Sequence, residues 1–184
     1  AKKLASLGDI YINDAFSCSH RQQASIHKIT KYIKECYAGP LLKKEVEAIN
    51  LVIKDKKKPV TCIIGGSKVS SKINVISNLI KNVENIVIVG AMANNFLAYN
   101  GIKVGKSLTE KDTDKIIDNI YVEAKKYNCN ILIPEDFNVS DNFANSGDIK
   151  KENSISENEM ILDIGPKTIE NIEKIIDQSN TVLW

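Results

Sequence analysis

A glycine pair followed by two lysines is the segment of this sequence best suited to chemistry. Residues 60–64 form a short apolar run, and Gly65, Gly66, Ser67 and Lys68 follow directly. Glycines let a backbone approach a ligand closely, and a helix beginning near Ser70 would turn free N–H groups toward it. On such a helix Lys68 and Lys72 would face one anion. The pattern predicts phosphate binding, although a tight turn with two solvated lysines explains this segment equally well.

Small residues also end the apolar run at 86–89. Gly90 and Ala91 follow it and would admit a flat ring against the backbone. Residues 105–107 look like the end of a Walker A loop, but position 100 is asparagine where that motif requires glycine, and no strand precedes it. Asn100 and Gly101 fit a helix C-cap better. No G-x-G-x-x-G fingerprint follows any strand, which counts against a dinucleotide-binding oxidoreductase domain.

A second candidate lies near the N-terminus, where His20 and Arg21 follow a short predicted strand at 9–12. An arginine fork can bind a carboxylate or a phosphate bidentately, although a lone loop arginine is usually a solvated surface residue. The cysteines are scattered without a C-x-x-C pair, and the two histidines lack zinc-ligand spacing. We expect reduced cysteines and no metal site built by this chain.

The elements that position these groups alternate between strands and helices. Strands are expected at 60–64, 86–89, 131–133 and 181–184, with a fifth candidate at 160–164. Helical apolar stripes at 73–80, 116–124 and 169–176 separate most of them, the second opened by a capping-box pattern from Thr109 to Asp112. Continuous apolar strands alternating with helices predict an α/β doubly wound parallel sheet. The polar stretch 138–159 is expected to leave that sheet.

Composition places the chain among ordinary globular proteins. Hydrophobic residues make up 43% and charged residues 26%, and the net charge is +2, so no global field favours nucleic acid or membrane. No apolar run approaches the roughly 20 residues of a membrane span, and no signal-peptide pattern opens the chain. These features predict a cytoplasmic protein without a nucleic-acid or membrane partner.

In combination and in this order, the motifs resemble the phosphoglycerate kinase family. The resemblance is carried by residues 7–16, 20–21, 38–42 and 65–73, and it continues through 92–97, 105–108, 163–166 and 182–184. It implies two Rossmann-like lobes joined by a long helix, as in a partial two-lobe kinase. Residues 1–38 would end the N-terminal substrate lobe, 39–57 would form the interdomain helix, and 58–184 would be the first half of the nucleotide lobe.

The family resemblance also implies roles for individual residues. Arg21 would hold phosphoglycerate, with His20 in the same basic patch, while Lys68 would contact the transferring phosphoryl group and Lys72 the nucleotide phosphates. The adenosine pocket would be lined by Gly65, Gly66, Gly90, Leu108, Phe137 and Leu162. The implied reaction is the reversible glycolytic transfer between 1,3-bisphosphoglycerate with ADP and 3-phosphoglycerate with ATP. Mg²⁺ would accompany the nucleotide, with its protein ligand outside this segment, and the complete protein would be a monomer.

This chain departs from the family pattern in two ways. The family usually has three consecutive glycines where Val89, Gly90 and Ala91 stand, so the added side chains would narrow the adenine slot. Its early substrate residues and late glycine-rich phosphate loop fall outside this sequence, so the isolated chain is expected to show no appreciable turnover. A non-catalytic nucleotide-binding module or scaffold is the alternative. Such a binder has no need for Arg21 on a different lobe from Lys68.

Overall fold

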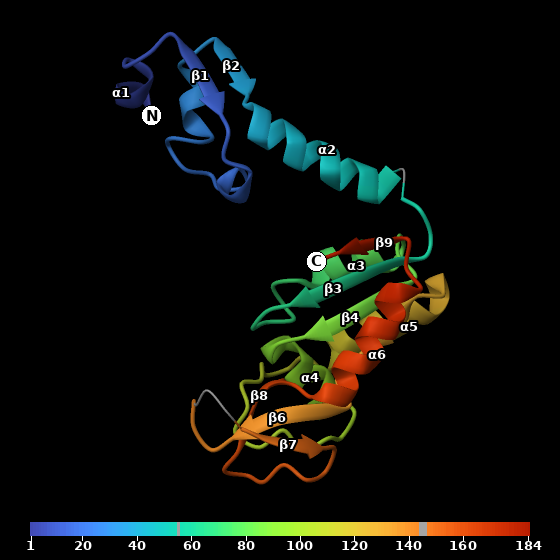
Figure 1. Cartoon of the computed structure of the whole chain (residues 1–184). Coiled ribbons are helices and arrows are strands. Elements are labelled where there is room, and N and C mark those ends of the chain that lie inside the picture. The colour runs from blue at the N-terminus through green and yellow to red at the C-terminus, as the bar shows by residue number, and fades with distance from the viewer. Residues whose placement is uncertain (55, 144–146) are drawn as a thin grey trace. The chain divides into compact units, whose positions relative to one another are not determined.

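Two units make up the computed structural model, which describes residues 1–54, 56–143 and 147–184. The first is Ala1–Lys56 and the second Lys57–Trp184 (Figure 1). Among the residues described, no helix combines the length and apolarity that crossing a bilayer requires.

The first unit is built around a two-stranded parallel sheet. After the short helix α1 (Lys2–Ala5), β1 (Ile10–Asn13) pairs with β2 (Glu35–Ala38). The 3₁₀ turns η1 (Phe16–Cys18) and η2 (Lys28–Lys31) lie between the two strands, and α2 (Pro40–Lys54) follows β2. The Asp14 carboxylate accepts a hydrogen bond from the Leu42 N–H at 2.9 Å and so caps the first turn of α2. Asp55, within the helix predicted over 39–57, lies outside the described residues.

A four-stranded parallel sheet forms the centre of the second unit, in the order β5-β4-β3-β9. Its strands are β3 (Val60–Gly65), β4 (Asn85–Val89), β5 (Asn130–Leu132) and β9 (Thr181–Leu183). The helices are α3 (Ile73–Ile80), α4 (Ala91–Tyr99), α5 (Asp114–Tyr127) and α6 (Pro166–Asp177). The predicted α/β class with a parallel sheet is confirmed.

Apolar strand residues and helix stripes build the core of this unit. Because its central strands are buried, β3 and β4 carry mostly apolar runs, as predicted, with the buried Thr61 as a polar exception in β3. The core includes Val60, Cys62, Ile76, Ile80, Ile86, Ile88, Phe96, Ile117 and Ile120, each at most 3% exposed. Burial raises the pKa of the Cys62 thiol to about 11. This thiol is therefore protonated near neutral pH and packs as a small apolar group.

The polar stretch 138–159 leaves the parallel sheet, as predicted, but it contributes strands to a second sheet that was not predicted. The fifth strand candidate, β8 (Met160–Ile164), is a strand of this second sheet and does not join the parallel one. β8 pairs antiparallel with β6 (Asp136–Ser140), which also pairs antiparallel with β7 (Asp148–Lys151). β7 is an edge strand that is exposed along most of its length. It therefore lacks the apolar alternation from which a strand is predicted.

Two predicted helix starts were also wrong. α3 begins at Ile73 rather than near Ser70, because the residues before it close a turn in which the Lys72 N–H donates to the Val69 carbonyl at 2.9 Å. Lys68 therefore precedes the helix and Lys72 is its N-cap residue, and whether both lysines face one anion stays a prediction. α5 begins at Asp114 with Thr113 at its N-cap, not at the capping box predicted from Thr109, and Asp112 has a left-handed φ of 59°.

Candidate functional site

The glycines that follow β3 and β4 lie against each other. The two strands are adjacent and parallel, with Gly65 opposite Val89, so their carboxyl ends meet at the same edge of the sheet. The Gly66 carbonyl accepts a hydrogen bond from the Met92 N–H at 2.7 Å. A Cβ on Gly90 would stand 3.5 Å from the Gly66 nitrogen. These contacts join the two glycine segments into one surface.

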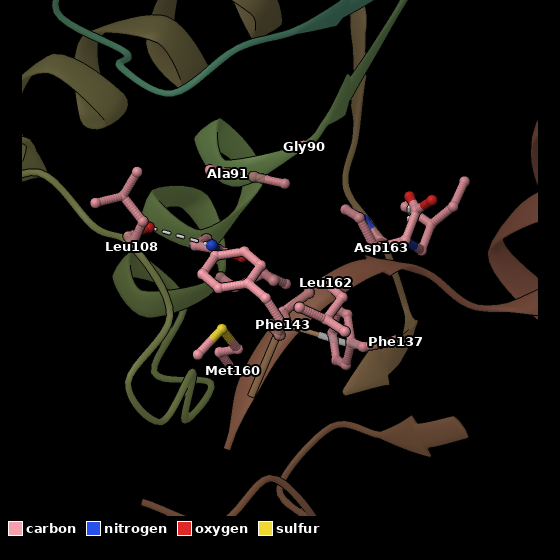
Figure 2. Close-up of a pocket in the computed structure, with 14 residues that line it drawn as sticks. Gly90, Ala91, Leu108, Phe137, Phe143, Met160, Leu162 and Asp163 are labelled. Atoms are coloured by element: carbon pink, nitrogen blue, oxygen red, sulfur yellow. Dashed lines mark hydrogen bonds between the residues drawn. The ribbon is translucent and has the colours of Figure 1, made fainter. Parts of the chain in front are cut away.

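A cavity of about 290 Å³ lies beside this surface (Figure 2). Four of the six residues that the family resemblance assigned to an adenosine pocket line it: Gly90, Leu108, Phe137 and Leu162. They come from the start of α4, the loop between α4 and α5, β6 and β8. Gly65 and Gly66 are not among its lining residues. The antiparallel sheet that the sequence analysis missed therefore supplies one wall of the cavity.

The cavity wall contains further residues that sequence reasoning missed. They are Ala93, Asn94, Leu97, Pro134, Phe143, Met160, Ile161, Asp163 and Ile164. Phe143 has 90% of its side chain exposed although it lines the cavity, so it lies at the opening. The apolar run at 160–164 was the signal that could have identified four of these residues. Phe143 stands in a polar stretch and gave no such signal.

Ala91 marks the departure from three consecutive glycines. It is the first residue of α4, and its methyl group lies at the cavity wall near Gly90 (Figure 2). Val89 is not among the lining residues, and its Cγ2 atom is 3.3 Å from the position that a Cβ on Gly65 would take. The cavity is therefore present although Val89 and Ala91 stand where the family usually has glycine.

The loop that carries Lys68 is tied down by an acidic side chain. Lys68 is exposed, whereas the next residue, Val69, is fully buried. The Glu110 carboxylate accepts a hydrogen bond from the Ser70 N–H at 3.1 Å and another from the Ser70 hydroxyl. These bonds, together with Lys68, hold the pKa of Glu110 below its ordinary value. The Ser70 N–H, which the sequence analysis expected to be free for a ligand, is therefore already engaged.

A buried carboxylate joins the cavity wall to α6. Asp136, 3% exposed, accepts hydrogen bonds from the N–H groups of Lys167 at 2.9 Å and Thr168 at 2.8 Å, and from the Thr168 hydroxyl at 2.6 Å. Burial by itself would raise the pKa of Asp136, but these bonds hold it below its ordinary value. A Cβ on Gly165 would come within 2.4 Å of this carboxyl group, so only glycine fits there. The arrangement fixes β6, which carries Phe137, against the start of α6.

His20 and Arg21 lie in the other unit. Both side chains are exposed between η1 and η2, where the Arg21 N–H donates to the Cys18 carbonyl at 3.0 Å. Lys68 belongs to the second unit. A shared site for these residues stays a prediction.

The parallel sheet, the glycines at its strand ends and the adjoining apolar cavity define a Rossmann-like α/β protein. A family model described as phosphoglycerate kinase matches residues 1–184. The chain belongs to the phosphoglycerate kinase family.

Individual relatives agree with this membership. The chain is 45% identical over 185 residues to a phosphoglycerate kinase of Wolbachia pipientis wMel, covering 100% of this chain and 46% of the relative. It is 41% identical over 186 residues to one from Francisella tularensis subsp. novicida, covering 100% and 47%. The solved phosphoglycerate kinase of Coxiella burnetii is 36% identical, with a TM-score of 0.83 over 100% of this chain and 48% of that one. The solved phosphoglycerate kinase of Pyrococcus horikoshii OT3 shares the fold, with a TM-score of 0.76 over 98% of this chain and 46% of that one. Its sequence identity to this chain is 24%. The chain spans about half the length of the curated relatives it matches.

Proposed function

We propose that this chain carries the nucleotide site of a phosphoglycerate kinase in its second unit and part of the acid-substrate site in its first. The reaction is the reversible transfer of a phosphoryl group between 1,3-bisphosphoglycerate with ADP and 3-phosphoglycerate with ATP. Membership of the family supports the reaction class. The cavity at the carboxyl end of β4 is the observation that carries the assignment of the nucleotide site.

The cavity suits an adenine ring. Its wall combines a glycine backbone with apolar side chains such as Leu108 and Leu162, which can cover both faces of a flat base. A volume of about 290 Å³ is at the lower end of the usual range for ligand pockets, so it would hold the base and leave the phosphates outside. Gly66, whose carbonyl binds the Met92 N–H of α4, and the nearby Lys68 lie where the chain leaves the neighbouring strand β3. The phosphates would therefore extend toward the Lys68 loop.

Lysine and arginine suit the chemistry that this reaction demands. Phosphoryl transfer asks a protein mainly to position two groups and to place positive charge against the equatorial oxygens. In this proposal Lys68 contacts the transferring phosphoryl group, Lys72 the nucleotide phosphates, and Arg21 with His20 the phosphoglycerate. Within residues 1–54, 56–143 and 147–184 no three histidine, cysteine or acidic side chains gather to hold a metal ion. In this proposal magnesium accompanies the nucleotide, and this chain's residues are assigned no step through it.

A thermal-shift experiment on this chain tests the proposal. ADP, ATP, NAD and 3-phosphoglycerate are added separately, and the adenine nucleotides and 3-phosphoglycerate are each expected to raise the Tm. Ligands that bind only the folded state stabilise it in proportion to the logarithm of their concentration over Kd. A shift with NAD alone would contradict the proposal. A shift with nucleotides but none with 3-phosphoglycerate would favour the non-catalytic binding module.

Substitutions assign the effects to residues. Arg21→Ala is expected to abolish the shift with 3-phosphoglycerate. The ADP shift should stay unchanged, because the proposed nucleotide site lies in the second unit and Arg21 in the first. Lys68→Ala is expected to reduce the ADP shift alone. Lys115→Ala, at an exposed lysine of α5, is the matched control for a general change of charge. An unchanged ADP shift in Lys68→Ala would remove Lys68 from the site.

A further inference from the structure

Glu110 is attached to the same helix that fixes the glycine surface. Its backbone N–H donates to the Oδ1 atom of Asn95 at 2.7 Å. Asn95 lies in α4, is 2% exposed, and donates from Nδ2 to the Met92 carbonyl at 3.3 Å. The N–H of Met92 in turn binds the Gly66 carbonyl at 2.7 Å. The backbone of Glu110 therefore has a fixed position relative to the start of the Lys68 loop.

The side chain of Glu110 fixes the far end of that loop. Its carboxylate binds both the N–H and the hydroxyl of Ser70, a residue 40 positions away in the sequence. Val69 beside it is fully buried and anchors the loop from the inside. Lys68 thus lies between Gly66, held through α4, and Ser70, held through Glu110. Both anchors depend on α4.

We propose that Glu110 is a positioning residue for phosphate binding, which holds the Lys68 loop in the conformation that meets the nucleotide phosphates. This inference rests on the proposed nucleotide site. Glu110 itself does not touch the ligand in this proposal. It acts by fixing Ser70, so that Lys68 need not be ordered when the nucleotide binds.

Simple electrostatics predicts the opposite effect. A carboxylate near Lys68 reduces the local positive potential, so its removal should strengthen binding of an anion. Loss of positioning should weaken the same binding, because the loop must then be ordered at the cost of conformational entropy. The two accounts differ in sign, so substitution of Glu110 distinguishes them.

The test measures the affinity of this chain for ADP and for adenosine by isothermal titration calorimetry. Adenosine fills the base cavity but has no phosphate, so the ratio of the two affinities reports on the Lys68 loop alone. Glu110→Ala is expected to lower the ADP affinity about tenfold and to leave adenosine binding unchanged, because the lost bonds are made to a charged acceptor. Glu110→Gln, whose amide oxygen still accepts from the Ser70 N–H, is expected to restore most of the ADP affinity. Glu173→Ala, at an exposed glutamate of α6, is the matched control and should change neither.

Each other outcome overturns the inference. Tighter ADP binding by Glu110→Ala would show that the carboxylate competes with phosphate. An equal loss for ADP and adenosine would show a merely structural role. Ser70→Ala, which deletes only the hydroxyl bond, gives a milder second test and should lower the ADP affinity without affecting adenosine. If the unaltered chain binds adenosine and binds ADP no more tightly, the Lys68 loop adds nothing to binding. Positioning by Glu110 then fails, while the base cavity stands. If it binds neither, the proposed nucleotide site fails as well.

Discussion

Replacing Asp136 with alanine removes the acceptor of three hydrogen bonds at the start of α6. The carboxylate is buried at 3% exposure, and its donors are the N–H groups of Lys167 and Thr168 and the Thr168 hydroxyl. After the substitution both N–H groups would face a small hole left by the side chain. We expect the second unit to lose stability and the Phe137 side of the cavity to loosen.

The size of the loss follows from these contacts. Hydrogen bonds to a charged group contribute about 1.5–3 kcal/mol each, and a buried donor left without a partner costs about 1–3 kcal/mol. Water entering the vacated space would satisfy part of the loss, so the three bonds do not add fully. We expect the free energy of unfolding to fall by about 3–5 kcal/mol.

Urea unfolding of this chain, followed by circular dichroism at 222 nm, measures the loss. With a slope of about 1.5–2 kcal/mol per M, the midpoint of the second unit should fall by about 2 M. The effect should also depend on pH. Because the folded-state pKa of Asp136 is lowered, its stabilisation is full above the ordinary aspartate pKa of about 3.9 and declines as the pH falls toward the folded-state value.

Asp177→Ala is the matched control, since Asp177 is an exposed aspartate in the last turn of the same helix. A carboxylate there opposes the helix dipole, so its removal should be neutral or slightly stabilising. If Asp136→Ala remained within about 0.5 kcal/mol of the unaltered chain, the usual range for surface substitutions, the reasoning on the buried cap would be refuted.

Three further predictions concern single residues. Gly90 has φ 66° and ψ −164°, a region open almost only to glycine. Gly90→Ala should therefore lower the free energy of unfolding in urea by about 1–3 kcal/mol, although the new Cβ would clash with nothing. An unaltered midpoint would contradict this. Leu108 lines the cavity, and 60% of its surface is exposed. Leu108→Ser should therefore weaken adenosine binding in calorimetry while the Tm stays nearly constant. A large fall in Tm would indicate that Leu108 belongs to the core instead. Hydrogen bonds from Lys150 and Ser156 lower the pKa of Glu159 to about 2. Lys150→Ala should therefore raise the Glu159 pKa, measured by NMR titration, toward about 4.3. A pKa that stayed near 2 would exclude Lys150 as the main cause.

The parallel sheet was predictable because its signal is local. Strands β3 and β4 are buried, so they carry apolar runs that can be recognised without knowing their partners. The helical stripes between them are periodic in the same local sense. β7 was missed because it is an exposed edge strand whose residues lack apolar alternation. β6 alternates the buried Phe137 and Val139 with polar residues, a signal that could have identified it.

The candidate site was predictable in part. Gly65, Gly66 and Gly90 follow predicted strands and so indicated a binding site, since parallel strands bring their carboxyl ends to one edge of the sheet. Leu108, Phe137 and Leu162 came only from the family resemblance, because nothing in their own segments indicates a common cavity. The roles of Arg21, His20, Lys68 and Lys72 stay predictions, as do magnesium and the reaction partners.

The sequence by itself determined that β3, β4, β5 and β9 are strands and that glycines stand at the ends of β3 and β4, because burial and backbone freedom are reflected within a few adjacent residues. Only the tertiary structure decided that Glu110 holds Ser70, that Asp136 caps α6, and that β8 forms a cavity wall rather than a strand of the main sheet. Each of these depends on a contact between residues more than 20 positions apart. Its energy belongs to the pair and cannot be assigned to either segment alone.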